Sequence, residues 1–204
     1  SSVFHGNRKF TKDMIYVSVL AMAYKQGDKI ALSKFVTIAT FGLYGFAFNA
    51  ISKATIVNSA IGNAAYPVLC KAGARSDRTE LCSTFKNLQL LMLYVNVLVF
   101  ASAIYFCFYL YEWVFDREAA EFLYGPTLLL CCGLYLNCSL ALPYRLILAL
   151  DQTEIAVKQD VLSLVFVLPL VILCTYKFGV LGASTSALFY AAFGIVYIIP
   201  KVYP

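Results

Sequence analysis

The sequence predicts an all-α, polytopic membrane protein, a bundle of six transmembrane helices. Hydrophobic residues make up 61% of the 204 residues and charged residues 13%, whereas a soluble domain carries about 45–50% apolar and about 25% charged residues. Runs without Asp, Glu, Lys or Arg, each close to the length that crosses a bilayer, cover 35–52, 54–70, 87–111, 122–144, 161–176 and 178–200. None of them alternates in polarity as the strands of a β-barrel would. The composition excludes a soluble enzyme.

The first three helices are expected at about residues 13–36, 41–70 and 81–115. The first begins after a cluster of charged residues that ends at Asp13. The second contains one charge, Lys53, and at 1.5 Å per residue it would be about 45 Å long, so it must tilt or protrude. A polar segment separates the second helix from the third.

The last three helices are expected at about residues 120–150, 155–176 and 181–199. The fourth contains Pro126 and Pro143, and the break before the sixth contains Gly179. We therefore expect residues 1–204 to form one transmembrane lobe. The chain starts without an initiator Met and without a signal-peptide pattern, and we interpret it as a fragment.

The distribution of Lys and Arg predicts the orientation, because these residues favour the cytoplasmic side of a membrane. If the N-terminus is cytoplasmic, the inner side holds ten basic residues and the outer side three. The inner set is Arg8, Lys9, Lys12, Lys71, Arg75, Arg78, Lys86, Arg145, Lys158 and Lys201, and the outer set is Lys34, Arg117 and Lys177. Both termini are therefore expected in the cytoplasm.

Several chemistries are not expected from this sequence. The net charge is +5, but the basic residues are dispersed and form no patch for nucleic acid. The seven cysteines lie mostly inside apolar runs, form no C-x-x-C pair and have only His5 to help bind a metal, so we interpret them as small helix-packing residues. We expect no cofactor. No Ser/His/Asp triad, phosphate loop or zinc signature is present, and an enzyme is not expected.

The residues that carry chemistry are charges inside predicted spans. Lys25, Asp28 and Lys29 stand at i, i+3 and i+4 and project from one helix face, where each charge costs roughly 2.5–3.5 kcal/mol on insertion scales. We predict that this face lines a watery, net positive cavity. The alternative is a structural Lys–Asp pair, which would leave one lysine unmatched.

Three weaker signals lie further along the chain. Lys53 stands among small and polar residues and would add to the cavity, or else it snorkels or pairs with Asp28. Arg145 follows Pro143 and would bind a lipid or sugar phosphate from the inner side, or else it marks the cytoplasmic interface. An aromatic belt at the outer surface is expected from Tyr105, Tyr109, Tyr111 and Trp113.

Several stretches of the chain resemble one family of transporters. Gln26-Gly27-Asp28-Lys29, Leu32-Ser33-Lys34-Phe35 and Phe41-Gly42-Leu43-Tyr44 resemble the seventh and eighth helices of Wzx-type O-antigen and capsule polysaccharide flippases, members of the multidrug/oligosaccharidyl-lipid/polysaccharide superfamily. Tyr66-Pro67 is similar to the end of the eighth helix, and the segment 178–183 to the turn into the twelfth. The resemblance covers nearly the whole chain, but family members have about twelve helices in two lobes. It implies that this chain is the C-terminal six-helix lobe.

The resemblance implies a transporter and not an enzyme. Its substrate would be an undecaprenyl-diphosphate-linked oligosaccharide, moved across the bacterial inner membrane for polysaccharide biosynthesis by alternating access around a cationic cavity. The substrate-binding residues would be Lys25, Lys29, Lys53 and Arg145, and Asp28 would pair with a lysine or carry a coupling ion. The expected partners are the lipid-linked anionic oligosaccharide, membrane lipids and the missing N-terminal lobe, but not nucleic acid.

Three other functions remain as alternatives. A cation-coupled multidrug exporter of the same superfamily would share the helix plan, but it would more often line its cavity with carboxylates. A membrane-bound polysaccharide polymerase or ligase would present a large periplasmic loop, and the expected outer loops here are short. A non-transporting scaffold would leave the lysines inside the spans unexplained.

Overall fold

The computed structural model describes residues 15, 22, 26–74, 78–150 and 152–202, and this part of the chain contains helices and no strand. Residues 26–35 are helical. The helices that follow are α2 (Ile38–Ser52), α3 (Thr55–Ala74), α4 (Arg78–Val114), α5 (Arg117–Ala149), α6 (Thr153–Phe178), α7 (Val180–Ser184) and α8 (Ser186–Val202). Four stretches among the described residues are long and apolar enough to cross a bilayer: α4, α5, α6 and the combined stretch Val180–Pro200. The protein is an all-α membrane protein.

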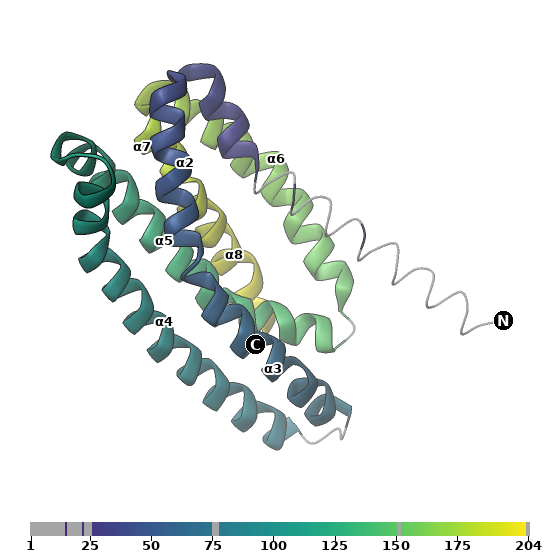
Figure 1. Cartoon of the computed structure of the whole chain (residues 1–204). Coiled ribbons are helices and arrows are strands. Elements are labelled where there is room, and N and C mark those ends of the chain that lie inside the picture. Colours follow the sequence, from purple (N-terminus) through teal and green to yellow (C-terminus); the bar gives the residue numbers. More distant parts are fainter. Residues whose placement is uncertain (1–14, 16–21, 23–25, 75–77, 151, 203–204) are drawn as a thin grey trace.

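Helix α5 lies at the centre of the bundle and contacts every one of α2, α3, α4, α6, α7 and α8. Figure 1 shows α4 along one edge of the bundle and α6 along the other, with α5 and α8 between them. Successive long helices run in opposite directions because short connections join them, such as the one between Val114 and Arg117. The core therefore forms around α5, and its polar side chains can reach helices on both sides.

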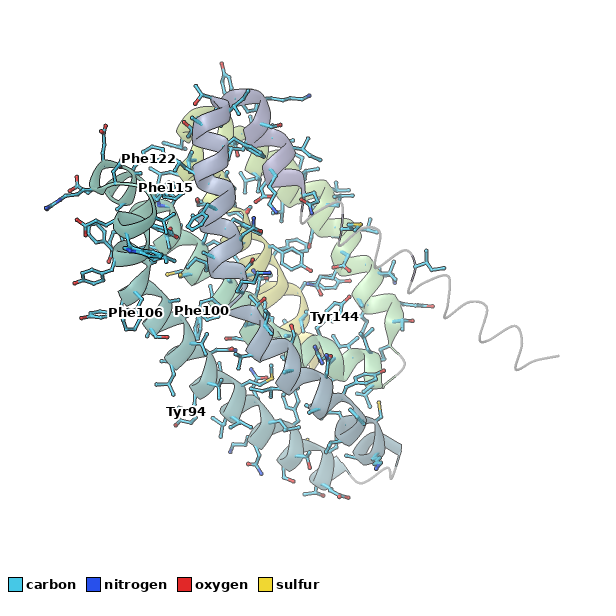
Figure 2. All side chains as sticks on the ribbon, viewed as in Figure 1. Tyr94, Phe100, Phe106, Phe115, Phe122 and Tyr144 are labelled. Carbon is cyan, nitrogen blue, oxygen red and sulfur yellow. The ribbon has the colours of Figure 1, made fainter. Side chains whose placement is uncertain are left out.

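The outward surfaces of α4 and α6 are rich in large apolar side chains. Tyr94 of α4 is 71% exposed and Phe106 is 62% exposed, and Figure 2 shows both pointing away from the bundle. On α6, Phe166, Leu173 and Tyr176 are exposed as well. In water such surfaces would be an aggregation hazard, whereas in a bilayer they are solvated by lipid tails.

Three of the four residues of the predicted aromatic belt are exposed near the C-terminal end of α4. Tyr105 and Tyr109 are exposed, and Trp113 is 84% exposed. Tyr111, however, is fully buried, and its hydroxyl lies 3.0 Å from Thr127 Oγ1 of α5. The assignment of Tyr111 to the belt is therefore wrong, because Tyr111 lies on the side of α4 that packs against α5.

The second predicted helix, expected without a break over 41–70, is divided into α2 and α3 at Lys53 and Ala54. Hydroxyl side chains flank the division: Ser52 Oγ donates to the Asn49 carbonyl at 3.0 Å and Thr55 Oγ1 donates to the Ser52 carbonyl at 2.7 Å. The backbone N–H of Ala54 bonds three residues back, to the Ile51 carbonyl. Ser and Thr compete in this way with regular helical bonding, and the length of an apolar run does not register that competition.

The sixth predicted helix, 181–199, is interrupted at Thr185, between α7 and α8. The Thr185 hydroxyl donates to the Gly182 carbonyl at 2.6 Å. Gly182 itself allows the close return of the chain onto α6, because a Cβ there would overlap the Cys174 backbone carbonyl and lie 2.7 Å from the Thr175 nitrogen. The other predicted boundaries that fall within the described residues lie within a few residues of the observed helix ends. The predicted start of the first helix, at about residue 13, lies outside the described residues.

Candidate functional site

Asp28 is a buried carboxylate inside the helix bundle. It lies in the helical segment 26–35 and is 4% exposed. The hydroxyl of Tyr44, fully buried in α2, donates to Asp28 Oδ2 at 2.9 Å, and the backbone N–H of Lys29 donates to Oδ1 at 2.8 Å. Both carboxylate oxygens therefore accept a hydrogen bond, which a carboxylate in a low-dielectric interior requires.

Lys29 is half-buried beside Asp28, and its ammonium lies over an aromatic ring. The distance from Lys29 Nζ to the centroid of the Phe48 ring of α2 is 4.2 Å, a cation–π contact. The helical segment that carries both charges also packs on α6, because a Cβ at Gly27 would lie 2.5 Å from Leu168 Cδ1. The Asp28–Lys29 pair is thus positioned between α2 and α6.

The structure brings some of the predicted cavity residues together and separates others. Asp28 and Lys29 share the contact with α2. Lys53 lies at the break between α2 and α3 with an exposed side chain, and the described hydrogen-bond donors to Asp28 are Tyr44 and the Lys29 backbone, not Lys53. Lys25 lies outside the described residues.

Arg145 lies on the C-terminal half of α5, where it faces α3. Its Nη1 donates to Asn63 Oδ1 at 3.0 Å. The guanidinium also rests against Gly62, where a Cβ would lie 2.7 Å from Nη1 and 2.8 Å from Nε. Arg145 is therefore placed by α3, away from the contacts that Asp28 and Lys29 make with α2.

A second buried carboxylate, Asp160 of α6, was not singled out from the sequence. It is 5% exposed. The hydroxyl of Tyr144 in α5 donates to Oδ2 at 3.3 Å, and the hydroxyl of Tyr190 in α8 donates to Oδ1 at 3.0 Å. Tyr144 is labelled in Figure 2, on the side of α5 that faces α6. The sequence did offer a signal for this site, because Asp160 is an acidic residue inside the predicted span 155–176.

Asp160 has further polar neighbours on the same helix. Gln159 and Ser163 are both buried, and Gln159 Oε1 and Ser163 Oγ have no hydrogen-bond partner among the described residues. Gln159 reaches towards α8, because a Cβ at Gly194 would lie 3.4 Å from its Nε2. The interface of α5, α6 and α8 is thus the second polar region of the bundle interior.

No metal-binding cluster is found in this arrangement. Within residues 26–74, 78–150 and 152–202 no group of three or more His, Cys, Asp or Glu side chains comes close enough to hold a metal ion. The described cysteines, for example Cys107 and Cys131 in the core between α4 and α5, are free thiols.

Comparisons with known proteins found no match. No family model, no curated protein and no solved structure matches the chain.

Proposed function

We propose that this chain is part of a membrane transporter that moves a lipid-linked anionic oligosaccharide across a bacterial inner membrane, as polysaccharide flippases do. The observation that carries the proposal is the Asp28–Lys29 pair between α2 and α6. A membrane protein retains charged side chains in its interior at a cost of roughly 2.5–3.5 kcal/mol each on insertion scales, and such residues mark solute or ion pathways.

The way the two charges are held supports separate roles for them. The carboxylate of Asp28 accepts from Tyr44 and a backbone N–H, while the ammonium of Lys29 lies over the ring of Phe48. A lysine that rests on an aromatic face keeps N–H donors directed elsewhere. In the proposed function Lys29, with Lys25, compensates the diphosphate of the substrate, and Asp28 responds to the coupling ion. Lys53 and Arg145 lie apart from this pair and would meet the diphosphate at another point of its path.

The proposal includes an arrangement of the chain in the membrane. It has six spans, with α2 and α3 together forming one broken span and α7 with α8 forming another. Both termini are cytoplasmic, following the distribution of Lys and Arg. The six-helix lobe would work with a second lobe, because alternating access requires two bodies that move around one site.

The test is complementation of a flippase-deficient bacterial strain with the full-length gene that encodes this chain. Lys29→Gln removes the charge and keeps hydrogen bonding, so surface polysaccharide should fall while the amount of protein in the membrane stays the same. Lys34→Gln is the matched control, because Lys34 is an exposed lysine on the same helical segment. Failure of the wild-type gene to restore any surface polysaccharide would contradict the proposed function.

A cation-coupled multidrug exporter is the second candidate, and the two buried carboxylates favour it. Asp28 and Asp160 are both held by tyrosine hydroxyls inside the bundle, and carboxylates in such positions serve cation or proton pathways. The flippase-deficient strain distinguishes the two functions, because an exporter would raise resistance to cationic drugs without restoring surface polysaccharide. Asp28→Asn should then abolish the resistance, whereas Lys29→Gln should leave it intact.

A further inference from the structure

At the contact between α5 and α3, Arg145 has hydrogen-bond donors that find no partner among the described residues. A guanidinium carries five N–H donors, and the bond that the structure gives it is the one from Nη1 to Asn63 Oδ1. Asn63 is exposed, so the place where the two side chains meet is open to the surface of the chain. Figure 1 shows α3 lying along the C-terminal half of α5. The remaining donors can therefore be reached from outside.

Helix α3 fixes the orientation of this guanidinium. A Cβ at Gly62 would lie 2.7 Å from Arg145 Nη1 and 2.8 Å from Nε, so the guanidinium would have to shift to admit a side chain there. The α3 backbone therefore lies directly against the guanidinium, and the amide of Asn63 holds one end of it. A side chain with this much rotational freedom is costly to order, and the contacts with Gly62 and Asn63 offset part of that cost.

The charge of Arg145 has no carboxylate partner among the described residues. Helix α3 contains no Asp or Glu, and both carboxylates of α5, Glu118 and Glu121, are in its first two turns, far from Arg145. The adjacent residue, Tyr144, is directed to Asp160 on the other side of α5. A guanidinium at an opening in a membrane protein can pair with an anion, and no carboxylate of the described residues supplies one.

We propose that Arg145, together with Gly62 and Asn63, binds a phosphate group of a membrane-borne lipid. The planar guanidinium matches two phosphate oxygens at once. The Nδ2 group of Asn63 adds a neutral donor, since its Oδ1 already accepts from Arg145. This inference deepens the proposed function and rests on it for one point only, that the phosphate belongs to the diphosphate of a polyprenyl-linked glycan.

The experiment is native mass spectrometry of the purified full-length protein titrated with undecaprenyl diphosphate, phosphatidylglycerol or undecaprenol, the last having no phosphate. Arg145→Gln should weaken binding of undecaprenyl diphosphate at least about 10-fold, the loss expected for charge-assisted hydrogen bonds. Gly62→Ala should also weaken it by displacing the guanidinium, and Arg145→Lys should weaken it less. Arg117→Gln, which removes an exposed arginine paired with Glu121 at the other end of α5, is the control and should bind as the wild type does.

The outcomes separate the source of the phosphate from the chemistry of the site. Loss of undecaprenyl diphosphate binding, with or without loss of phosphatidylglycerol binding, supports the inference as stated. Loss of phosphatidylglycerol binding only would retain the phosphate site but overturn its link to the transported substrate. Unchanged phosphate-lipid binding by Arg145→Gln, or an equal loss of undecaprenol binding, would overturn the inference. A wild-type gene that fails complementation while these losses persist would refute the proposed function and leave the phosphate site.

Discussion

On the α6 and α8 side of α5, Tyr144 and Tyr190 donate to the two carboxylate oxygens of Asp160 at 3.3 and 3.0 Å. On the α3 and α4 side, the hydroxyls of Tyr111 and Thr127 are in contact, and three further polar contacts between helices involve amides and one guanidinium. They are the bonds from Asn96 Nδ2 to Asn58 Oδ1, from Gln89 Nε2 to the Ser139 carbonyl and from Arg145 Nη1 to Asn63 Oδ1. The same central helix thus separates an enclosed carboxylate from an accessible cation.

The difference shows two ways in which this bundle surrounds charged side chains with neutral polar groups. A tyrosine hydroxyl satisfies a carboxylate oxygen without bringing in a cation, and Asp28 is held in the same manner by Tyr44. An amide such as Asn63 orients a guanidinium without neutralising it. Neutral polar groups of this kind leave the formal charge in place, whereas apolar packing would supply more stability.

The largest effect on stability is expected from removing the two tyrosine hydroxyls that donate to Asp160. In the double variant Tyr144→Phe/Tyr190→Phe, the carboxylate loses both of these donors in a buried place, and we expect a loss of about 2–4 kcal/mol in the free energy of unfolding. Unfolding in detergent–SDS micelles measures it. The matched control is Tyr94→Phe/Tyr105→Phe, two exposed tyrosines of α4, which should change stability little. Equal effects of the two pairs would show that the hydroxyls do not hold the carboxylate.

The sequence predicted the membrane class and the approximate helix boundaries because both depend on apolar run lengths, which are local. It did not predict the breaks at Lys53 and at Thr185, which arise from hydroxyl-to-backbone bonds that apolar counting ignores. It also missed Asp160, because no sequence spacing relates that residue to Tyr144 and Tyr190 on two other helices. Hydrogen bonds between helices depend on how the helices pack, and they cannot be predicted from residue spacing in a single sequence.

Placement of the charged residues was predictable only in part. Asp28 and Lys29 are adjacent in the sequence and therefore lie near one another. The sequence did not indicate that Tyr44 would donate to Asp28 or that Lys29 would lie over the ring of Phe48. Arg145 was singled out by its position after Pro143, and the glycine that accommodates it, Gly62, lies 83 residues earlier in the chain. Such a close approach appears only once α3 and α5 are packed together.

A smaller effect tests whether an amide of α4 replaces a hydrogen bond that is missing from the backbone of α5. Pro143 has no N–H, so the Ser139 carbonyl one turn earlier lacks its helical donor, and Gln89 Nε2 of α4 donates to it at 2.9 Å. Gln89→Leu should destabilise the protein by about 1 kcal/mol, but the cost should largely vanish in a Pro143→Ala background, where the new N–H can bond to Ser139. The double-mutant cycle in the same micelle assay measures this coupling.

The control for that cycle is Gln152→Leu, because Gln152 is exposed and forms no side-chain cap at the start of α6. It should leave stability nearly unchanged in either background. Additive costs of Gln89→Leu and Pro143→Ala would contradict the view that Gln89 replaces the missing helical bond. The polar contacts between α4 and α5 would then be no different in kind from ordinary packing.

The smallest expected effect concerns Asn58 and Asn96, two buried amides joined at 3.2 Å between α3 and α4. Side-chain hydrogen bonds between transmembrane helices average about 0.6 kcal/mol in double-mutant cycles. Each single substitution, Asn58→Leu or Asn96→Leu, leaves one amide without its partner, whereas the double substitution removes both and should cost less than the sum. A coupling near 0.6 kcal/mol would place this contact well below the tyrosine–carboxylate contacts of Asp160. A coupling as large as theirs would remove the distinction between the two sides of α5, because neutral amides would then stabilise the bundle as strongly as the donors to a charge.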